Sequence, residues 1–93
     1  MIDGFEWDTE KDRQNYMKHE VSFSEAVHAF ADGLKIIIED IKHSDAEQMM
    51  YCVGKIANGI VIVRYTVRDG KIRIFGAGYW RQAKKLYYEK NHL

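Results

Sequence analysis

Apolar residues in the first third of the chain recur with the spacing of helices. Residues 5–7 (Phe-Glu-Trp) predict a very short strand or an extended lead-in, and Asp8 is suited to cap a polar helix over residues 9–19. Ser22 and Glu25 match a capping box, which predicts that a second helix begins there. The apolar side chains of this second helix form one stripe, made of Phe23, Ala26, Val27 and Phe30.

From residue 34 onward the hydrophobic pattern becomes that of β-strands. Gly33 is expected to end the second helix in a left-handed conformation. Four strands are predicted over residues 34–39, 48–56, 60–68 and 68–75, followed by a basic helix over residues 79–89. The dipeptides Asn58-Gly59 and Asp69-Gly70 are typical of hairpin turns. The predicted fold is one α+β domain over residues 1–93, a four-stranded antiparallel sheet with two N-terminal helices and a C-terminal helix on one face.

The hairpin turns assign the strand residues to two faces of the sheet, because side chains alternate along a strand. A two-residue turn at Asp69-Gly70 places Arg68 opposite Lys71, Thr66 opposite Arg73 and Arg64 opposite Phe75. One face is then apolar and is the expected core face: Val61, Val63, Tyr65, Val67, Ile72 and Ile74. The other face is basic: Arg64, Arg68, Lys71 and Arg73, with Thr66 among them. A two-residue turn at Asn58-Gly59 adds Tyr51, Val53 and Lys55 to this basic face, whereas a slip of one residue sends them to the core.

The charges of the chain are unevenly distributed, although the formal net charge is zero. Residues 1–50 hold five Lys or Arg against twelve Asp or Glu, a balance of −7, whereas residues 51–93 hold nine against two, a balance of +7. Opposed cations such as Arg68 and Lys71 are unfavourable unless an anion lies between them. A phosphate backbone is such an anion, and planar guanidinium groups bind it in a bidentate manner. The alternative is a solvated face whose arginines pair with the acidic first half.

Composition limits the other classes of protein. An apolar content of 46% with 30% charged residues is typical of a globular domain. No segment approaches the about 20 apolar residues of a membrane helix. The single cysteine, Cys52, cannot form an internal disulfide, and no Cys or His spacing matches a zinc site. We therefore expect a reduced, cytoplasmic protein without metal or cofactor, in which Cys52 packs on the core face.

Several isolated residues have more than one interpretation. Tyr51 could stack on a base or take part in proton transfer. Trp80 shares a helical stripe with Ala83 and Tyr87, so we expect these side chains to pack in the core or against a partner. Gly76-Ala77-Gly78 lacks the later glycine of a dinucleotide loop and is expected to be a bend between strand and helix.

Short motifs spread over residues 5–89 carry a family resemblance. They are Phe5-Glu6-Trp7-Asp8, Lys11, Asn15, Lys18-His19, Val21-Ser22-Phe23, Glu25-Ala26, Phe30-Ala31-Asp32, Arg64-Tyr65-Thr66, Ile72-Arg73-Ile74 and Tyr88-Glu89. In this order and at these spacings the chain resembles the BrnT family, toxins of bacterial type II toxin–antitoxin operons.

The resemblance implies a RelE-like fold and a metal-independent RNA endonuclease that inhibits translation. It also implies a ribbon-helix-helix antitoxin similar to BrnA as the partner. A heterotetramer is one possible form of the complex. The complex would repress its own operon, and the chain would contact operator DNA only as part of that complex. In the implied reaction the ribose 2′-hydroxyl attacks the adjacent phosphate, and the protein supplies position, charge and proton transfer.

The resemblance also suggests roles for individual residues. Arg64 and Arg73 match positions that would hold the scissile phosphate, and Lys18 and His19 match the Lys-His pair of the family. The remaining basic and aromatic candidates are assigned to RNA binding: Tyr51, Lys55, Arg68, Lys71, Arg81, Lys84 and Lys85.

One segment departs from the family pattern. After the last strand the common pattern is Ser-Ala-Arg and then a helix with an internal Glu, whereas this chain has Gly76-Ala77-Gly78 and Lys84 at those places. An arginine is a natural ligand of phosphate. Two hypotheses remain: Arg81 replaces it from one helical turn later, or the chain cuts poorly and serves as an antitoxin partner and corepressor.

Overall fold

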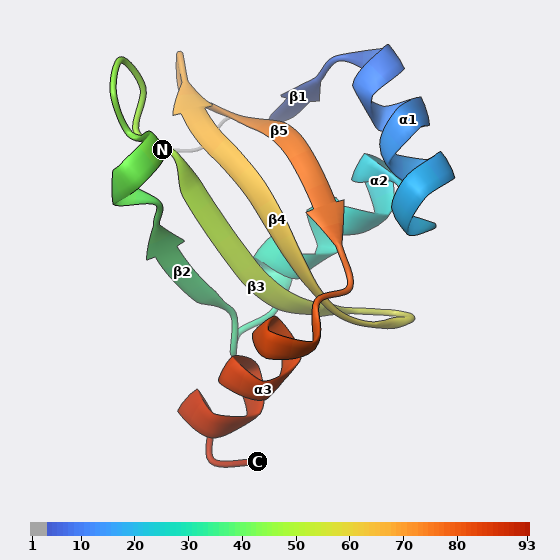
Figure 1. Ribbon diagram of the computed structural model, residues 1–93, viewed down its shortest axis with the longest axis vertical. Coiled ribbons are helices and arrows are strands. Elements are labelled where there is room, and N and C mark those ends of the chain that lie inside the picture. The colour runs from blue at the N-terminus through green and yellow to red at the C-terminus, as the bar shows by residue number, and fades with distance from the viewer. Residues whose placement is uncertain (1–3) are drawn as a thin grey trace.

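Five strands form one mixed sheet in the computed structural model, which describes residues 4–93. The strands are β1 (Phe5–Trp7), β2 (Ile36–Glu39), β3 (Met50–Ile56), β4 (Gly59–Arg68) and β5 (Lys71–Gly78). Their order in the sheet is β1-β5-β4-β3-β2 (Figure 1). β1 runs parallel to β5, and the other neighbours are antiparallel.

The prediction of a four-stranded antiparallel sheet was therefore wrong in one respect, although the α+β class is confirmed. The segment Phe5–Trp7 is a fifth strand, and Phe5 pairs with Ile72. The backbone N–H of Ile72 also donates to the carbonyl of Gly4 at 2.9 Å. A parallel pair between segments so far apart in the chain has no turn between its strands, so no local signal predicts it.

The predicted starts of the first two helices are confirmed by their capping hydrogen bonds, whereas the C-terminal helix begins at Arg81 and not at Tyr79. In α1 (Thr9–His19), Asp8 Oδ1 accepts from the backbone N–H groups of Glu10 and Lys11 at 2.9 and 3.0 Å. Ser22 and Glu25 form both hydrogen bonds of a capping box at the start of α2 (Phe23–Ala26). These caps satisfy backbone N–H groups that a helix end leaves without partners.

The end of the second helix differs from the prediction. α2 has only four residues and continues as the 3-10 helix η1 (Val27–Ala31). Gly33 does not take a left-handed conformation there. Instead, Asp32 has extended backbone angles, and its carboxylate accepts from the backbone N–H of Leu34 at 2.9 Å. The side chain of Asp32 closes the turn in the way that Asp and Asn often do, so a left-handed glycine is not required.

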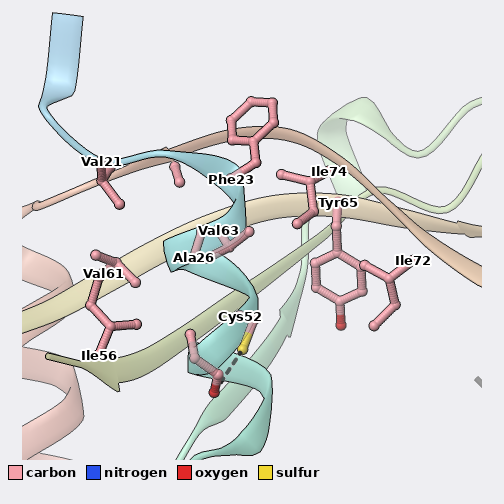
Figure 2. Packing of buried hydrophobic residues seen from close by; sticks show 12 residues of the cluster. Val21, Phe23, Ala26, Cys52, Ile56, Val61, Val63, Tyr65, Ile72 and Ile74 are labelled. Atoms are coloured by element: carbon pink, nitrogen blue, oxygen red, sulfur yellow. Dashed lines mark hydrogen bonds between the residues drawn. The ribbon is translucent and has the colours of Figure 1, made fainter. Parts of the chain in front are cut away.

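Helices cover both faces of the sheet, which corrects the prediction that they share one face. α2 and η1 pack on the face that carries the main core, and Figure 1 shows them behind the sheet. Figure 2 shows this core, whose labelled side chains are Val21, Phe23, Ala26, Cys52, Ile56, Val61, Val63, Tyr65, Ile72 and Ile74. Cys52 is fully buried, as predicted. Val67 is on this face but is 51% exposed, so its assignment to the core was wrong.

The C-terminal helix α3 (Arg81–Lys90) packs on the opposite face. Its residues Ala83 and Tyr87 form a second apolar cluster with Val53 and Ile60. A 3-10 turn, η2 (Ile41–His43), lies in the polar loop between β2 and β3. α3 thus covers the apolar end of the face that the sequence marks as basic, because Val53, Ile60 and Ile62 alternate onto that face.

The last hairpin has the predicted turn but contains a bulge. Arg68 pairs with Lys71 and Thr66 with Arg73, as predicted. The register then shifts, so Arg64 pairs with Gly76 and not with Phe75, and the predicted Arg64–Phe75 pair was wrong. One extra residue on a strand inverts the faces of all later residues.

This shift changes the role of the segment 76–78. The segment was predicted to be a bend, but it belongs to β5. Because Gly76 pairs with Arg64 and Gly78 pairs with Ile62, both glycines lie on the face of Arg64, and Ala77 is buried on the core face.

The other hairpin turns one residue earlier than predicted. Ile56 pairs with Gly59, so Ala57 and Asn58 form the turn, and Gly59 follows with a φ of 145°. The pairing differs from the prediction by two residues, which leaves the faces unchanged. Tyr51 is therefore opposite Arg64 and shares its face, and the predicted faces of Val53 and Lys55 are confirmed.

Candidate functional site

Asn15 joins the end of α1 to β5. Its Nδ2 donates to the carbonyl oxygens of Ala77 at 2.9 Å and Val21 at 3.0 Å, and its Oδ1 accepts from the N–H of Ala77 at 3.1 Å. The side-chain amide thus pairs with the edge of β5 as a neighbouring strand would. This attachment places His19 beside Gly78, where a Cβ atom would lie 3.7 Å from Cγ and Nδ1 of the imidazole.

A cavity of about 410 Å³ opens at this junction, and we call it the main cavity. It lies on the side of the sheet that carries Arg64. Its lining residues are Asn15, His19, Tyr51, Ile62, Arg64, Gly76, Ala77, Gly78, Tyr79 and Trp80. The bulge in β5 contributes to this space, because it turns two glycines toward the face of Arg64. Because Gly76 and Gly78 have no side chains, they leave room beside Arg64 on this face.

Arg64 differs from the other arginines of the sheet. Within residues 4–93 it has no carboxylate at ion-pair distance, and its Nε atom is buried without a hydrogen-bond partner. Arg68 donates to both oxygens of Glu47, at 2.8 and 2.7 Å, and Arg73 donates to Glu6 at 3.1 Å. The pairing of sheet arginines with the acidic half is therefore observed for Arg68 and Arg73. Arg64 retains the capacity to bind an anion.

Tyr51 lies next to Arg64 and is part of a small polar network. Its hydroxyl donates to Asp40 Oδ2 at 3.1 Å, and Nδ1 of His43 lies 2.8 Å from the same oxygen. Burial and the hydrogen bond to Asp40 raise the pKa of Tyr51, so its phenol remains a hydrogen-bond donor at neutral pH. Burial opposes ionisation of Asp40, but the hydrogen bonds from His43 and Tyr51, together with neighbouring positive charge that includes Arg64, outweigh it and lower the pKa of that carboxyl.

The four predicted catalytic residues are only partly brought together. Arg64 and His19 both line the main cavity. Lys18 lies with His19 at a separate hollow of about 190 Å³ beside Phe75, the extra residue of the bulge. Arg73 lies opposite Thr66, pairs with Glu6 and does not line either space.

The residues assigned to RNA binding are also dispersed. Tyr51 lines the main cavity, whereas Arg68 is paired with Glu47 and Lys71 is exposed at the last hairpin. Lys55 is exposed at the far end of β3, where its backbone N–H donates to Asp32 at 2.8 Å.

The C-terminal helix carries the remaining candidates. Arg81 and Lys84 line a hollow of about 300 Å³, which we call the α3 hollow. Lys85 is exposed, and its Nζ lies 3.9 Å from Glu89. Ala83 and Tyr87 are buried as predicted, but Trp80 is 53% exposed, so it does not pack in the core.

Two contributors to the site were missed by the residue-level argument. Asn15 appeared only as part of a family motif, although it holds the cavity together through Ala77 and Val21. Asp40 lies in a polar loop without a motif, and its contact with Tyr51 spans 11 residues of sequence. Neither role has a local signal, because each depends on a partner from another element.

Two kinds of feature are absent from the described residues. Within residues 4–93 no group of three or more His, Cys, Asp or Glu side chains is placed to hold a metal ion. No helix of the same residues is long and apolar enough to cross a membrane.

Comparisons with known proteins give one family match. A search of curated proteins finds no match. A family model described as the ribonuclease toxin BrnT of type II toxin–antitoxin systems matches residues 7–84. The chain therefore belongs to the BrnT family of ribonuclease toxins.

Proposed function

We propose that the chain is a metal-independent endoribonuclease that binds the scissile phosphate of RNA in the main cavity, at Arg64. The observation that carries this proposal is the unpaired state of Arg64 among residues 4–93, with a buried Nε that has no partner. A buried donor without a partner is unfavourable, and a phosphate oxygen would satisfy it. The neighbouring Tyr51 hydroxyl lies on the same face, and its one hydrogen is donated to Asp40, so it can donate to the phosphate only after it releases that carboxylate.

The proposed reaction needs only the RNA and side chains of this chain. The 2′-oxygen bonds to the adjacent phosphorus as the bond from phosphorus to the 5′-oxygen breaks, which leaves a 2′,3′-cyclic phosphate and a 5′-hydroxyl. One proton leaves the 2′-hydroxyl and one reaches the 5′-oxygen. His19 is the imidazole at the cavity, and an imidazole can both accept and donate protons near neutral pH. Arg64 stabilises the charge that develops on the phosphate.

Lys18 and Arg73 act on the flanking backbone in this proposal. Lys18 is exposed beside His19. There its ammonium attracts a flanking phosphate of the RNA backbone that lies outside the main cavity. Arg73 is about one quarter exposed and shares its charge with Glu6, so its contribution requires that ion pair to open. We therefore rank Arg73 below Arg64.

Substitution of Arg64 tests the proposal. Arg64→Gln keeps a polar side chain but removes the guanidinium and its charge, and we expect RNA cleavage to fall by roughly 10²–10³-fold. Arg68→Gln is the matched control on the same strand and face: unlike the assignment that the resemblance suggested, this proposal gives Arg68 no part in RNA binding, because Glu47 already neutralises it. We expect this control to cut RNA within about twofold of the wild type, since exposed ion pairs contribute little.

The measurement is cleavage of end-labelled RNA by purified protein, with growth arrest after induction as a second assay. The melting temperature of each variant shows whether the fold is intact. An Arg64→Gln protein that is folded and as active as the wild type would refute the proposed site, and His19 with Lys18 would then become the primary candidates.

The partner belongs to the same proposal. As a family member the chain pairs with a cognate antitoxin. The antitoxin is a ribbon-helix-helix protein that forms a cytoplasmic heterotetramer with this chain and covers at least one of Arg64, Arg73 and Arg81, because the free toxin must be silenced. A structure of the complex in which all three arginines remain accessible would contradict this arrangement, as would a partner of another fold encoded in the same operon.

A second function has one observation in its favour. Gly78 presents no side chain toward His19, whereas the family pattern implies an arginine at that place. The chain would then keep the fold and bind the antitoxin as a corepressor without cutting RNA. Soluble wild-type protein that binds the antitoxin, leaves RNA intact and does not arrest growth would support this second function over the first.

A further inference from the structure

The α3 hollow adjoins the main cavity. It is lined by Asn58, Gly59, Ile60, Tyr79, Trp80, Arg81 and Lys84, and the two spaces share Tyr79 and Trp80. A chain of nucleotides with one phosphate at Arg64 would therefore reach the α3 hollow by passing these two aromatic rings.

The two shared aromatic side chains are accessible and held in place by the backbone. Trp80 is 53% exposed and Tyr79 is 41% exposed. A Cβ atom at Gly59 would lie 3.6 Å from the Tyr79 ring, so this ring lies against the β3–β4 hairpin. Trp80 directly precedes α3, whose position is fixed by the burial of Ala83 and Tyr87. Aromatic rings on such a rigid support lose little freedom when a base stacks on them.

The charges of the α3 hollow favour an anionic ligand. Its lining contains the cations Arg81 and Lys84 and no carboxylate. Neither cation is in an ion pair within residues 4–93, in contrast to Lys85 one residue further along the helix. Cations beside accessible aromatic rings are the combination with which proteins bind single-stranded nucleic acid.

We propose that the α3 hollow binds the nucleotide next to the scissile phosphate of single-stranded RNA. Its base stacks on Trp80, and its phosphate is bound by Arg81 and Lys84. This inference rests on the proposed function, because it extends the RNA path from the main cavity. Of the two expectations for Trp80, its exposure excludes packing in the core and leaves packing against a partner, whereas stacking on a base uses the same exposure.

The test is the binding of a short 2′-O-methyl RNA, whose methylated 2′-oxygen cannot attack the phosphate. Binding is measured by fluorescence anisotropy of the labelled oligonucleotide. We expect Trp80→Ala to weaken binding by about 10-fold or more, as loss of a stacked base does. Tyr16→Ala is the matched control: Tyr16 is also 53% exposed but lies on α1 and lines neither space, so we expect no change in affinity.

An abasic version of the oligonucleotide separates stacking from phosphate binding. Without bases, the wild type should bind more weakly, and Trp80→Ala should cause no further loss. Arg81→Ala should weaken binding of both oligonucleotides and should lower the salt dependence of binding by about one phosphate contact. The melting temperature of each variant shows that the fold is intact.

The outcomes separate this proposal from the proposed function. Equal binding of the oligonucleotide by Trp80→Ala and the wild type would overturn the stacking site, even if Arg64→Gln abolishes cleavage. Weakened binding by Trp80→Ala would support the stacking site, even if Arg64→Gln still cuts RNA. A wild type that binds neither oligonucleotide would reject the site. Loss of antitoxin binding by Trp80→Ala, with RNA binding unchanged, would assign this surface to the protein partner and would also overturn it.

Discussion

Gly78 and His19 lie side by side at the main cavity. A Cβ at Gly78 would meet the His19 ring at 3.7 Å, which is an ordinary van der Waals distance. The φ of Gly78 is not in the left-handed region that favours glycine. A longer side chain is therefore compatible with the backbone here and would extend into the main cavity beside Arg64.

Gly78→Arg should increase RNA cleavage. A second guanidinium at the main cavity would add charge stabilisation for the phosphate, and we expect a gain of roughly 10- to 100-fold. The measurement is the rate of cleavage of end-labelled RNA by purified protein. Gly33→Arg is the matched control. No atom lies within 4 Å of the Cβ position at Gly33, and this variant adds the same charge away from the main cavity. Equal gains in both variants would show a general effect of charge and would contradict a specific site beside His19.

Among single residues, the paired and unpaired arginines show how far a sequence pattern describes a site. Alternation along β4 places Arg64 and Arg68 on one face, and the structure confirms this placement. The pattern does not show that Arg68 binds Glu47 and that Arg64 has no such partner within residues 4–93. The loop before β3 brings Glu47 to Arg68, whereas Asp40 of the same loop feels the charge of Arg64 but forms no ion pair with it.

At the scale of elements, η1 lies in close contact with β3. A Cβ at Gly54 would lie 2.5 Å from the carbonyl oxygen of Ala29 and 3.0 Å from its Cβ. Cys52 lies two residues earlier on β3, and its thiol donates to the same carbonyl oxygen with a sulfur–oxygen distance of 3.8 Å. Figure 2 draws a hydrogen bond from Cys52 as a dashed line. The 3-10 helix therefore rests directly on the backbone of the strand, and only glycine fits beneath it.

Gly54→Ala should lower the free energy of unfolding by about 1–3 kcal/mol, because η1 must move away from the sheet. Urea unfolding measures this change. Gly33→Ala is the matched control: no atom lies within 4 Å of its Cβ position and its φ is not left-handed, so it should be neutral or raise stability by up to about 1 kcal/mol. A Gly54→Ala protein as stable as the wild type would contradict the close contact of η1 with β3.

At the scale of the whole molecule, titratable groups are buried on both faces of the sheet. Burial raises the pKa of Cys52 under η1 to about 12. Burial and the hydrogen bond to Asp32 raise the pKa of Tyr87, on the buried side of α3, to about 12. Burial also raises the pKa of Tyr51 and Tyr65. Each of these groups is uncharged when it is protonated, so the folded state binds these protons more tightly than the unfolded state.

Stability should therefore decrease at alkaline pH. The unfolded chain loses the Cys52 and Tyr87 protons near the ordinary pKa values of 9.0 and 10.0, whereas the folded chain keeps these two protons until pH about 12. The stabilisation is fully present below pH about 9 and is lost as the pH rises toward 12. Urea unfolding at a series of pH values measures this loss. Tyr87→Phe and Cys52→Ala should each make the decrease less steep, and a wild-type curve that is flat between pH 9 and 12 would contradict the burial of both groups.

The two oppositely charged halves of the chain meet across the sheet. β1 brings Glu6 to Arg73, and the loop before β3 brings Glu47 to Arg68. These pairs use part of the basic charge of residues 51–93, whereas Arg64 at the main cavity and Arg81 and Lys84 at the α3 hollow have no ion pair within residues 4–93. This arrangement explains how a chain with no net charge can present a local site for an anion, because local fields and not total charge attract ligands.

Features that depend on neighbouring residues were determined by the sequence itself. The Asp8 cap, the Ser22–Glu25 capping box and the turn at Asp69-Gly70 all agree with the prediction. The two faces of β3 and β4 also agree, because alternation needs only a correct strand and the parity of one turn. The family resemblance was likewise visible in the order of short motifs, and the family match over residues 7–84 confirms it.

Features that depend on distant partners were decided only by the tertiary structure. The parallel pairing of β1 with β5, the bulge at Phe75 and the packing of α3 on the second face each join segments far apart in the chain. The main cavity is of the same kind, since Asn15 must bind Ala77 before His19 can lie beside Gly78. Local sequence patterns do not indicate such contacts, because the contacts stabilise the chain only when the distant segments meet. The sequence by itself therefore determined the chemical groups available, and the tertiary contacts decided which of them share a site.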